Sequence, residues 1–280
     1  MDKFSIRTEA NSVLKSKGKP LFKINFLGTG GAFDVKEGES SAIVETRLGK
    51  KILIDCGHTS YVYLKENEMT QEIGTVFITH THSDHISGLS TLIYDRFFIH
   101  NLTTDIECTP EVAVLLRQYL KVTNNAENQY TINTSNVFIE DEGISIAKID
   151  TTKHHWPSGD YPNSGLIFHF DTGDDHAVLI YSGDINVSIL DLMNPVDYPF
   201  VYDKPENVFI FHDMTSIDHE DNAHTNFNLL SPMMGVFKNV FTYHHGQGDV
   251  EKINKVNPKI AFTSLIIQGK DFVVEESRGL

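Results

Sequence analysis

The sequence is short of cysteine and of long apolar segments, and each shortage excludes a class of protein. Two cysteines among 280 residues provide no disulfide framework, which favours a reducing compartment, although one Cys56–Cys108 bridge stays open. No apolar run approaches the ~20 residues that a membrane helix needs. The N-terminus also lacks the charged and then apolar pattern of a secretory signal. We therefore expect a cytoplasmic protein without a membrane partner.

Positive charge is also scarce. The chain has 23 Lys and Arg against 38 Asp and Glu, which gives a formal net charge of −15. Proteins that grip long nucleic acids usually carry a basic face, because phosphate neutralisation supplies most of the affinity. The strongest basic segments here are residues 15–19 and the Lys50-Lys51 pair. Long nucleic acid is therefore disfavoured as a partner, and a small anionic substrate fits better.

Histidine, in contrast, is concentrated in one segment. His80, His82, Asp84 and His85 lie within six positions, directly after the apolar run 76–78. Imidazole and carboxylate are ligands that borderline divalent ions such as zinc prefer. A loop of ordinary surface polar residues is the alternative, and the residues that flank the motif disfavour it. The segment therefore predicts a metal site.

Polar clusters also follow four other apolar, strand-like segments. These clusters are Gly28-Thr29-Gly30-Gly31, His154-His155, Ser182-Gly183-Asp184 and His244-His245. Strands packed in sheets with reactive groups at their ends predict an α/β sandwich whose site lies along one edge. We expect an N-terminal arm over residues 1–20 and one hydrolase domain over residues 21–280.

Local signals place several elements of this domain. Leu48-Gly49 separates two β-prone segments and predicts a hairpin turn. Thr109 followed by Pro110 predicts a helix that begins at Pro110 and runs to Leu120, with Thr109 as its N-cap. The polar stretch 122–136 reads as a surface excursion rather than a domain linker.

The pattern His-x-His-x-Asp-His at the end of a strand resembles the ligand loop of the metallo-β-lactamase superfamily. The resemblance implies the αββα sandwich of that superfamily and two metal ions, expected to be Zn²⁺, with Mn²⁺ or Mg²⁺ as an alternative in one position. It also implies seven metal ligands: His80, His82, Asp84, His85, His154, Asp184 and His244.

Two of these ligands are choices between neighbours. We favour His154 over His155 as the third histidine of the first ion, and His244 over His245 as the last ligand of the second. Asp184 matches the carboxylate that bridges both ions. Asp55 resembles a buried acid that orients the ligand histidines.

Two further segments resemble the ribonuclease Z branch of the superfamily. They are residues 26–33, FLGTGGAF, and residues 211–215, FHDMT, which are followed by Ala223-His224-Thr225. The resemblance implies that His224 protonates the leaving oxygen; an ordinary surface histidine is the alternative. Residues 97–104 lack the Gly-Pro strand end and the basic arm with which ribonuclease Z enzymes clamp tRNA. The chain is thus more similar to the compact, dimeric anti-Pycsar phosphodiesterases, which destroy cyclic-pyrimidine immune signals.

The resulting prediction is a homodimeric, dinuclear metal-dependent phosphodiesterase that opens a cyclic mononucleotide. Asp84 and His224 are its expected catalytic residues, and Phe33, Trp156 and Tyr161 are candidates for contact with the base. Two enzymatic alternatives are a ribonuclease Z-like tRNA 3′-processing endonuclease and another metallo-hydrolase of a cyclic phosphate or lactone. A metalloprotein that binds without catalysis is the third alternative.

Overall fold

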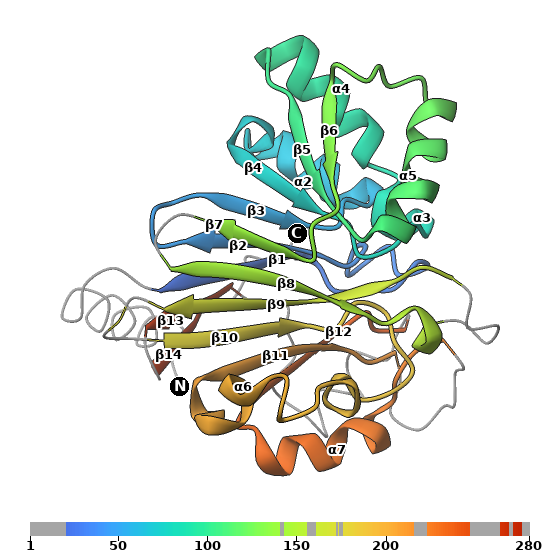
Figure 1. Cartoon of the computed structure of the whole chain (residues 1–280). Helices are drawn as coiled ribbons and strands as arrows, with labels where there is room; N and C mark the ends of the chain where they lie inside the picture. The colour runs from blue at the N-terminus through green and yellow to red at the C-terminus, as the bar shows by residue number, and fades with distance from the viewer. Residues whose placement is uncertain are drawn as a thin grey trace.

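Two β-sheets face each other in the computed structural model (Figure 1). The structure describes residues 21–140, 143–155, 161–171, 173, 176–215, 223–246, 264–268 and 271–275. The predicted N-terminal arm, residues 1–20, and Trp156 lie outside these residues.

The first sheet is mixed, with β1 to β3 and β13 to β14 antiparallel and β3 to β6 parallel. Its strands, in spatial order, are β14 (Asp271–Glu275), β13 (Ser264–Gln268), β1 (Phe22–Gly28), β2 (Ser41–Thr46), β3 (Lys51–Ile54), β4 (Ile73–Phe77), β5 (Thr104–Glu107) and β6 (Tyr130–Asn133).

The second sheet is also mixed. The pairs β12–β11 and β11–β10 are parallel, and the remaining neighbours are antiparallel. Its strands, in spatial order, are β12 (Asn239–Tyr243), β11 (Val208–Asp213), β10 (His176–Tyr181), β9 (Ser164–Asp171), β8 (Ile144–Asp150) and β7 (Val137–Glu140).

Helices cover the outer face of each sheet (Figure 1). Those on the first sheet are α2 (His58–Glu66), α3 (Ser83–Ile86), α4 (Leu89–His100) and α5 (Pro110–Val122). Those on the second are α6 (Pro199–Asp203) and α7 (Phe227–Val236). Short 3₁₀ turns connect several elements: η1 (Thr70–Glu72), η2 (Thr152–His154), η3 (Ile189–Leu192) and η4 (Pro205–Asn207).

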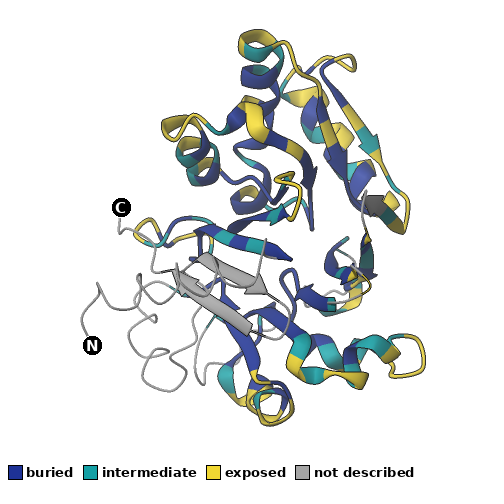
Figure 2. Cartoon of the chain, turned by 90° about the vertical axis from the view of Figure 1, so that its left-hand side faces the viewer, coloured by how far each residue is buried: buried dark blue, intermediate teal, exposed yellow. Residues whose placement is uncertain are grey.

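Three apolar cores separate the layers. The central core lies between the sheets, where Phe22 of β1 stacks on Phe170 of β9 with ring centroids 4.3 Å apart. A second core joins the first sheet to α2, α4 and α5, and a third joins the second sheet to α6 and α7. Figure 2 shows the strands buried and the outer turns of the helices exposed. Four layers with three cores confirm the predicted αββα sandwich.

The local predictions are largely confirmed. The hairpin turns between β2 and β3, where Gly49 has φ +83°, a left-handed value that glycine adopts without strain. Helix α5 begins at Pro110, and the Thr109 hydroxyl accepts a hydrogen bond from the backbone N–H of Val112. The excursion predicted over 122–136 is wrong in part, because Tyr130–Asn133 forms the edge strand β6. This strand has four residues, of which one is buried, so its sequence lacks the alternating pattern that would predict a strand.

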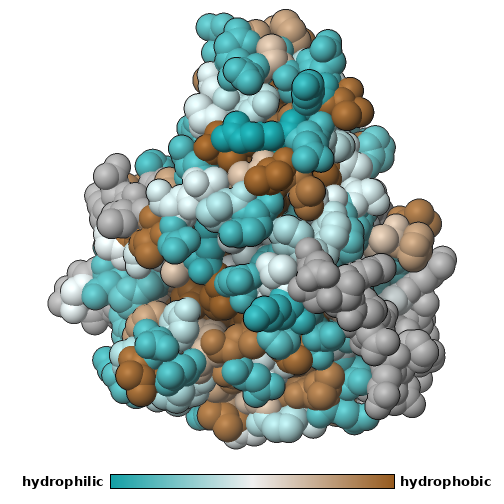
Figure 3. All heavy atoms as spheres, turned by 45° about the vertical axis from the view of Figure 1, so that its right-hand side comes forward, coloured by the Kyte–Doolittle hydropathy of each residue, from teal (hydrophilic) through white to brown (hydrophobic). Residues whose placement is uncertain are grey.

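One face of the molecule can be followed in the space-filling view (Figure 3). On the face in Figure 3, hydrophobic side chains occur in separate groups among hydrophilic ones. Within the described part of the chain, no helix combines the length and the apolarity that crossing a bilayer requires.

Candidate metal centre

The loop that carries the predicted ligands leaves β4 and is held by hydrogen bonds on both sides. The backbone N–H and the hydroxyl of Thr79 donate to the Asp55 carboxylate at 2.8 and 2.7 Å. His80 pairs with Asn163 in an isolated antiparallel bridge. Farther along, the carbonyl of His85 accepts from the backbone N–H of Cys56 at 2.7 Å. The loop therefore presents its side chains from a fixed backbone.

His80, His82 and His155 form a first cluster, in which one ring nitrogen from each lies within 4.8 Å of the others. The preference for His154 is thus not what the structure shows: His155 occupies that place. His154 ends the 3₁₀ turn η2 and is half-buried, whereas His155 is fully buried. Successive residues of a 3₁₀ turn point about 120° apart, so one member of the pair faces the cluster.

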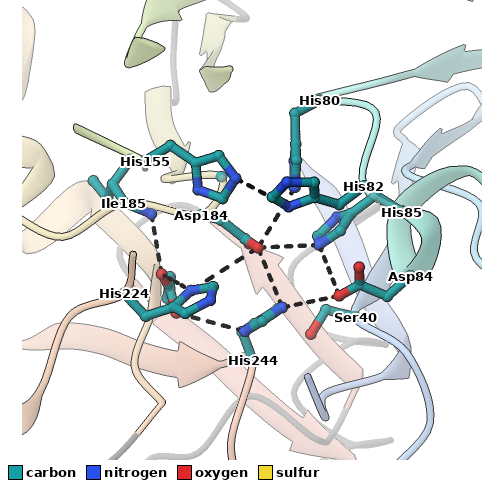
Figure 4. A network of polar contacts seen from close by, with 12 residues as sticks. Ser40, His80, His82, Asp84, His85, His155, Asp184, Ile185, His224 and His244 are labelled. Atoms are coloured by element: carbon teal, nitrogen blue, oxygen red, sulfur yellow. Dashed lines mark hydrogen bonds and ion pairs between the residues drawn. The ribbon is translucent and has the colours of Figure 1, made fainter. Parts of the chain in front are cut away.

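Asp84, His85, Asp184 and His244 form a second cluster. Nε2 of His244 lies 3.2 Å from both the Asp84 and the Asp184 carboxylates, and Nε2 of His85 lies 3.2 Å from Asp184. Asp184 is also 3.7 Å from Nε2 of His80 in the first cluster. Figure 4 shows Asp184 between the two groups of histidines. The Asp184 carboxylate therefore lies close to ring nitrogens of both clusters.

The backbone is strained where it delivers two of the site's side chains. Asp55 and His244 have φ values of +58° and +62°. This left-handed region costs a non-glycine residue roughly 1–2 kcal/mol. Such outliers persist where the surrounding structure imposes them, often at functional sites. The strain therefore marks the ends of β3 and β12 as places where side-chain direction matters.

Asp55 holds the histidine loop through a buried contact with His85. It is fully buried, and its carboxylate lies 2.8 Å from Nδ1 of His85. This contact turns Nε2 of His85 toward Asp84 and Asp184. The predicted contact between Asp55 and a histidine of the loop is confirmed, and the role of Asp55 in orienting a metal ligand stays a prediction.

Burial and charge favour opposite protonation states in the two clusters. Burial, reinforced by His85, lowers the pKa of His80 well below its ordinary value, and burial lowers the pKa of His155 to about 4. Burial alone would also lower the pKa of His85, but the carboxylates of Asp184, Asp84 and Asp55 outweigh it and raise that pKa. The first cluster therefore offers neutral nitrogen ligands, and the second attracts a cation.

The residues present fit a pair of divalent ions. Among the described side chains, Nε2 of His80 and Oδ1 of Asp184 are buried without a hydrogen-bond partner. Buried polar atoms are nearly always paired, so such orphans call for an explanation, such as an ion. A set of three imidazoles beside a mixed histidine and carboxylate set is chemistry that Zn²⁺ accepts.

His224 stands beside both clusters with a carboxylate partner. Its Nδ1 lies 3.0 Å from Asp213, at the end of β11, and 4.0 Å from Asp184. Its ring stacks on that of His244 with centroids 4.5 Å apart. Asp213 also accepts from the backbone N–H of Ile185 at 3.0 Å. The structure thus brings the predicted His224 to the site rather than leaving it on an unrelated surface.

Sequence reasoning gave Asp213 no role. Its signal was available, because it follows an apolar strand as Asp184 does, but an acid in that place is common. The structure adds the partner that distinguishes it, since Asp213, His224 and His244 form a third group of close ligand atoms.

The three candidates for base contact differ in their settings. Tyr161 is half-buried against the first cluster, where its ring stacks on His82 at 4.4 Å and its hydroxyl lies 2.8 Å from that of Thr81. Phe33 is 85% exposed. It belongs to a loop fixed beside the second cluster, because the backbone N–H of Gly31 donates to the carbonyl of His245 at 2.9 Å. Trp156 is not described.

Gly31 lets this loop approach the second cluster closely. A Cβ placed on it would lie 3.1 Å from Cε1 of His244, which is tighter than most real Cβ contacts. An alanine here would require the His244 ring to shift by a few tenths of an ångström.

Sequence comparison adds a family to this geometry. The profile of a family described as "Anti-Pycsar protein Apyc1" matches residues 22–272. The chain is 38% identical over 86 residues to the anti-Pycsar protein Apyc1 of Bacillus phage BSP38, covering 30% of this chain and 34% of that protein. It is 25% identical over 146 residues to the ribonuclease Z of Methanosarcina acetivorans, covering 50% of this chain and 48% of that protein. The chain thus aligns with about a third of the length of the anti-Pycsar relative.

Comparison with solved structures identifies the fold. The metallo-β-lactamase fold protein YhfI of Bacillus subtilis superposes with a TM-score of 0.65 at 15% identity, covering 86% of this chain and 93% of that one. The short form of human tRNase Z superposes with a TM-score of 0.60 at 17% identity, covering 80% and 93%. Likeness at such identities concerns the fold alone. The chain has the metallo-β-lactamase fold.

Proposed function

The chain belongs to the anti-Pycsar protein Apyc1 family, and from this premise we propose that it is a metal-dependent phosphodiesterase that hydrolyses a cyclic mononucleotide. The preferred substrate would be a cyclic-pyrimidine signal. The observation that carries the proposal is Asp184, which lies between a three-histidine cluster and a histidine–carboxylate cluster, with His224 beside both. A binding protein has no need of that additional, carboxylate-paired histidine.

We assign the first ion to His80, His82 and His155, and the second to Asp84, His85 and His244, with Asp184 shared. The ions are expected to be Zn²⁺, with Mn²⁺ or Mg²⁺ as an alternative in one position. When bound, such ions acidify water and offset the charge that develops on phosphoryl oxygens.

The chain's own residues would orient the reaction and handle its protons. Asp55 fixes the ring of His85, so the carboxylates of Asp84 and Asp184 face a defined nitrogen. Asp213 engages Nδ1 of His224, and we therefore assign proton donation to Nε2. A departing ribose oxygen is a strong base and needs such a proton, which positioned acids supply with gains of about 10²–10⁴ in rate.

The general activity is tested with bis(4-nitrophenyl) phosphate. Purified protein should hydrolyse it, and both a chelator and Asp84→Ala should abolish turnover. Asp203→Ala is the matched control, since Asp203 is an exposed acid at the end of α6. Turnover that survives both the chelator and Asp84→Ala would refute the metal mechanism.

The substrate class is tested by a panel of 3′,5′-cyclic mononucleotides beside a precursor tRNA. We expect opening of the cyclic nucleotides, fastest with pyrimidine bases, and no cleavage of the tRNA. The net charge of −15 supports this expectation, because tRNA binding calls for a basic surface. Cleavage of the tRNA alone would favour the ribonuclease Z-like alternative.

A homodimer and a cytoplasmic location complete the proposal. Cys56 and Cys108 are both free and buried in the structure, which suits a reducing compartment. The dimer is checked by analytical ultracentrifugation of the purified protein.

A further inference from the structure

Asn163 lies at the meeting point of three segments that carry candidate ligands. It is fully buried and immediately precedes β9. Its backbone pairs with His80 on the histidine loop. Its carbonyl accepts from the backbone N–H of Thr151 at 3.1 Å, at the start of the turn that leads to His155. Two of the three segments are thus held by its main chain.

The side chain of Asn163 reaches the third segment. Its Nδ2 donates to the backbone carbonyl of Asp184 at 2.6 Å and to the hydroxyl of Thr151 at 2.8 Å. A primary amide nitrogen carries two hydrogens, so both bonds form at once. Because the Asp184 carbonyl can only accept, it determines which end of the amide is nitrogen. One side chain therefore connects the segments of His155 and Asp184.

The fit around this amide is tight. Gly183 has φ +66°, and a Cβ on it would lie 2.6 Å from the carbonyl of Ser164 and 3.3 Å from Oδ1 of Asn163. The turn that precedes Asp184 therefore packs closely against the backbone of Asn163 and Ser164. A ligand set works when its members are held to within about 0.5 Å, which requires support of this kind.

We propose that Asn163 is a positioning residue that sets the affinity of the centre for its metal ions. It fixes the His80, His155 and Asp184 segments relative to one another without contributing a ligand. The ion it would serve belongs to the proposed function, but the inference concerns metal binding and is tested without turnover.

The test compares Asn163→Ala with Ser164→Ala. The first removes both amide donors and adds no charge. The second is the matched control, since Ser164 is an adjacent buried residue whose hydroxyl donates to the carbonyl of Thr79 at 3.3 Å instead of joining Thr151 to Asp184. Zinc affinity is measured by competition with a chromogenic chelator, and the stability of the metal-free proteins by thermal melting.

We expect Asn163→Ala to bind zinc about 10–100-fold more weakly, the range found for residues that orient metal ligands. The zinc affinity of Ser164→Ala should stay within about threefold of that of the parent, even if its melting temperature falls as much as that of Asn163→Ala. Equal zinc affinity of Asn163→Ala and the parent would overturn the proposal. So would equal losses of affinity in the two variants at equal losses of stability.

A second pair covers the case in which Asn163→Ala does not fold. Thr151→Val keeps the shape of the side chain and removes one acceptor of the amide, whereas Thr151→Ser keeps that acceptor. We expect weaker zinc binding in Thr151→Val than in Thr151→Ser, and equal binding would refute the proposal. If zinc binding falls as expected while the parent opens no phosphodiester, the positioning role stands and the proposed function fails.

Discussion

At the scale of single residues, His224, paired with Asp213, is expected to donate a proton rather than to bind a metal ion. Its contribution can therefore be measured separately from that of the ions. His224→Ala should lower the turnover of a cyclic nucleotide by about 10²–10⁴, because the ribose oxygen leaves as a strong base. The same variant should lower turnover of bis(4-nitrophenyl) phosphate far less, since 4-nitrophenolate leaves without a proton. Steady-state rates with both substrates check this. Equal losses would show that His224 acts through the metal centre instead.

His212 gives the stability of the protein a dependence on pH. Its Nε2 accepts from the backbone N–H of Ile189 at 2.9 Å and its Nδ1 lies 2.8 Å from the carbonyl of Asp213, so both nitrogens are used by the neutral ring. Burial lowers the pKa of His212 to about 4, from an ordinary value of 6.5. Between these values the unfolded chain binds the additional proton. The stabilisation is therefore complete above pH 6.5 and declines as the pH falls toward 4.

The expected loss is about 3 kcal/mol below pH 4, since one pKa unit corresponds to about 1.4 kcal/mol. Urea unfolding of metal-free protein from pH 7.5 to 4 measures it. His212→Gln should show a shallower decline than the parent, and His58→Gln, at an exposed histidine, should match the parent. An unchanged slope in His212→Gln would contradict the prediction.

The sequence alone predicted which residues belong to the site where their chemistry was sufficient to identify them. His80, His82, Asp84 and His85 crowd one loop, and no folding requirement explains that composition. The choice between His154 and His155 depended on the phase of a single 3₁₀ turn, which no periodic pattern records. The amide of Asn163 gave no signal either, because its importance lies in contacts with residues 12 and 21 positions away.

At the scale of elements, a buried ion pair away from the metal centre joins the two sheets. Nζ of Lys148 on β8 lies 2.8 Å from Glu107 on β5, and both side chains are almost fully buried. Lys148 also donates to the carbonyls of Cys108 and Ser135 at 2.9 Å. The lysine thus connects β8 of the second sheet to the end of β5 in the first and to Ser135, through three hydrogen bonds.

Removal of Lys148 alone should be costly. Lys148→Met leaves the Glu107 carboxylate buried without its cation, a change that typically costs about 3–5 kcal/mol. Glu107→Leu combined with Lys148→Met should cost less than the sum of the single changes. A double-mutant cycle by urea unfolding measures the coupling. Strictly additive losses would show that the pair has no interaction across the sheets.

Elements were predicted best where a local signal identified an end, as Thr109 and Pro110 did for the start of α5, whereas its end lies at Val122 rather than at the predicted Leu120. The order of strands within each sheet was not predictable in this way. Parallel neighbours such as β10 and β11 pair across a long connection, and their register depends on tertiary packing. The edge strand β6 was missed for a related reason, since it pairs on one side with β5.

At the scale of the whole molecule, the candidate ligands come from both sheets. Asp84 and His85 follow β4 of the first sheet, whereas Asp184 and His244 follow β10 and β12 of the second. Bound ions would therefore connect the two halves of the sandwich. Their removal should lower the thermal stability of the entire domain rather than loosen one loop.

This expectation has a measurable size. An ion at 1,000 times its dissociation constant stabilises the folded state by about 4 kcal/mol. Melting curves of chelated protein titrated with Zn²⁺ should rise with concentration, and Asp84→Ala should rise less. A melting temperature that does not respond to the metal would contradict the assignment of ions to these clusters.

The distance along the chain between Asp84 and His244 also has a consequence for synthesis. These side chains lie 3.2 Å apart in space and 160 residues apart in sequence. During translation the histidine loop leaves the ribosome long before its last partner exists. At about 5–20 residues per second, the interval is on the order of 10 seconds. Until its final strands emerge, a newly made chain can therefore offer a metal ion only part of its ligand set. During this interval, a shortage of the metal or an excess of a competing ion would impair correct loading of the site.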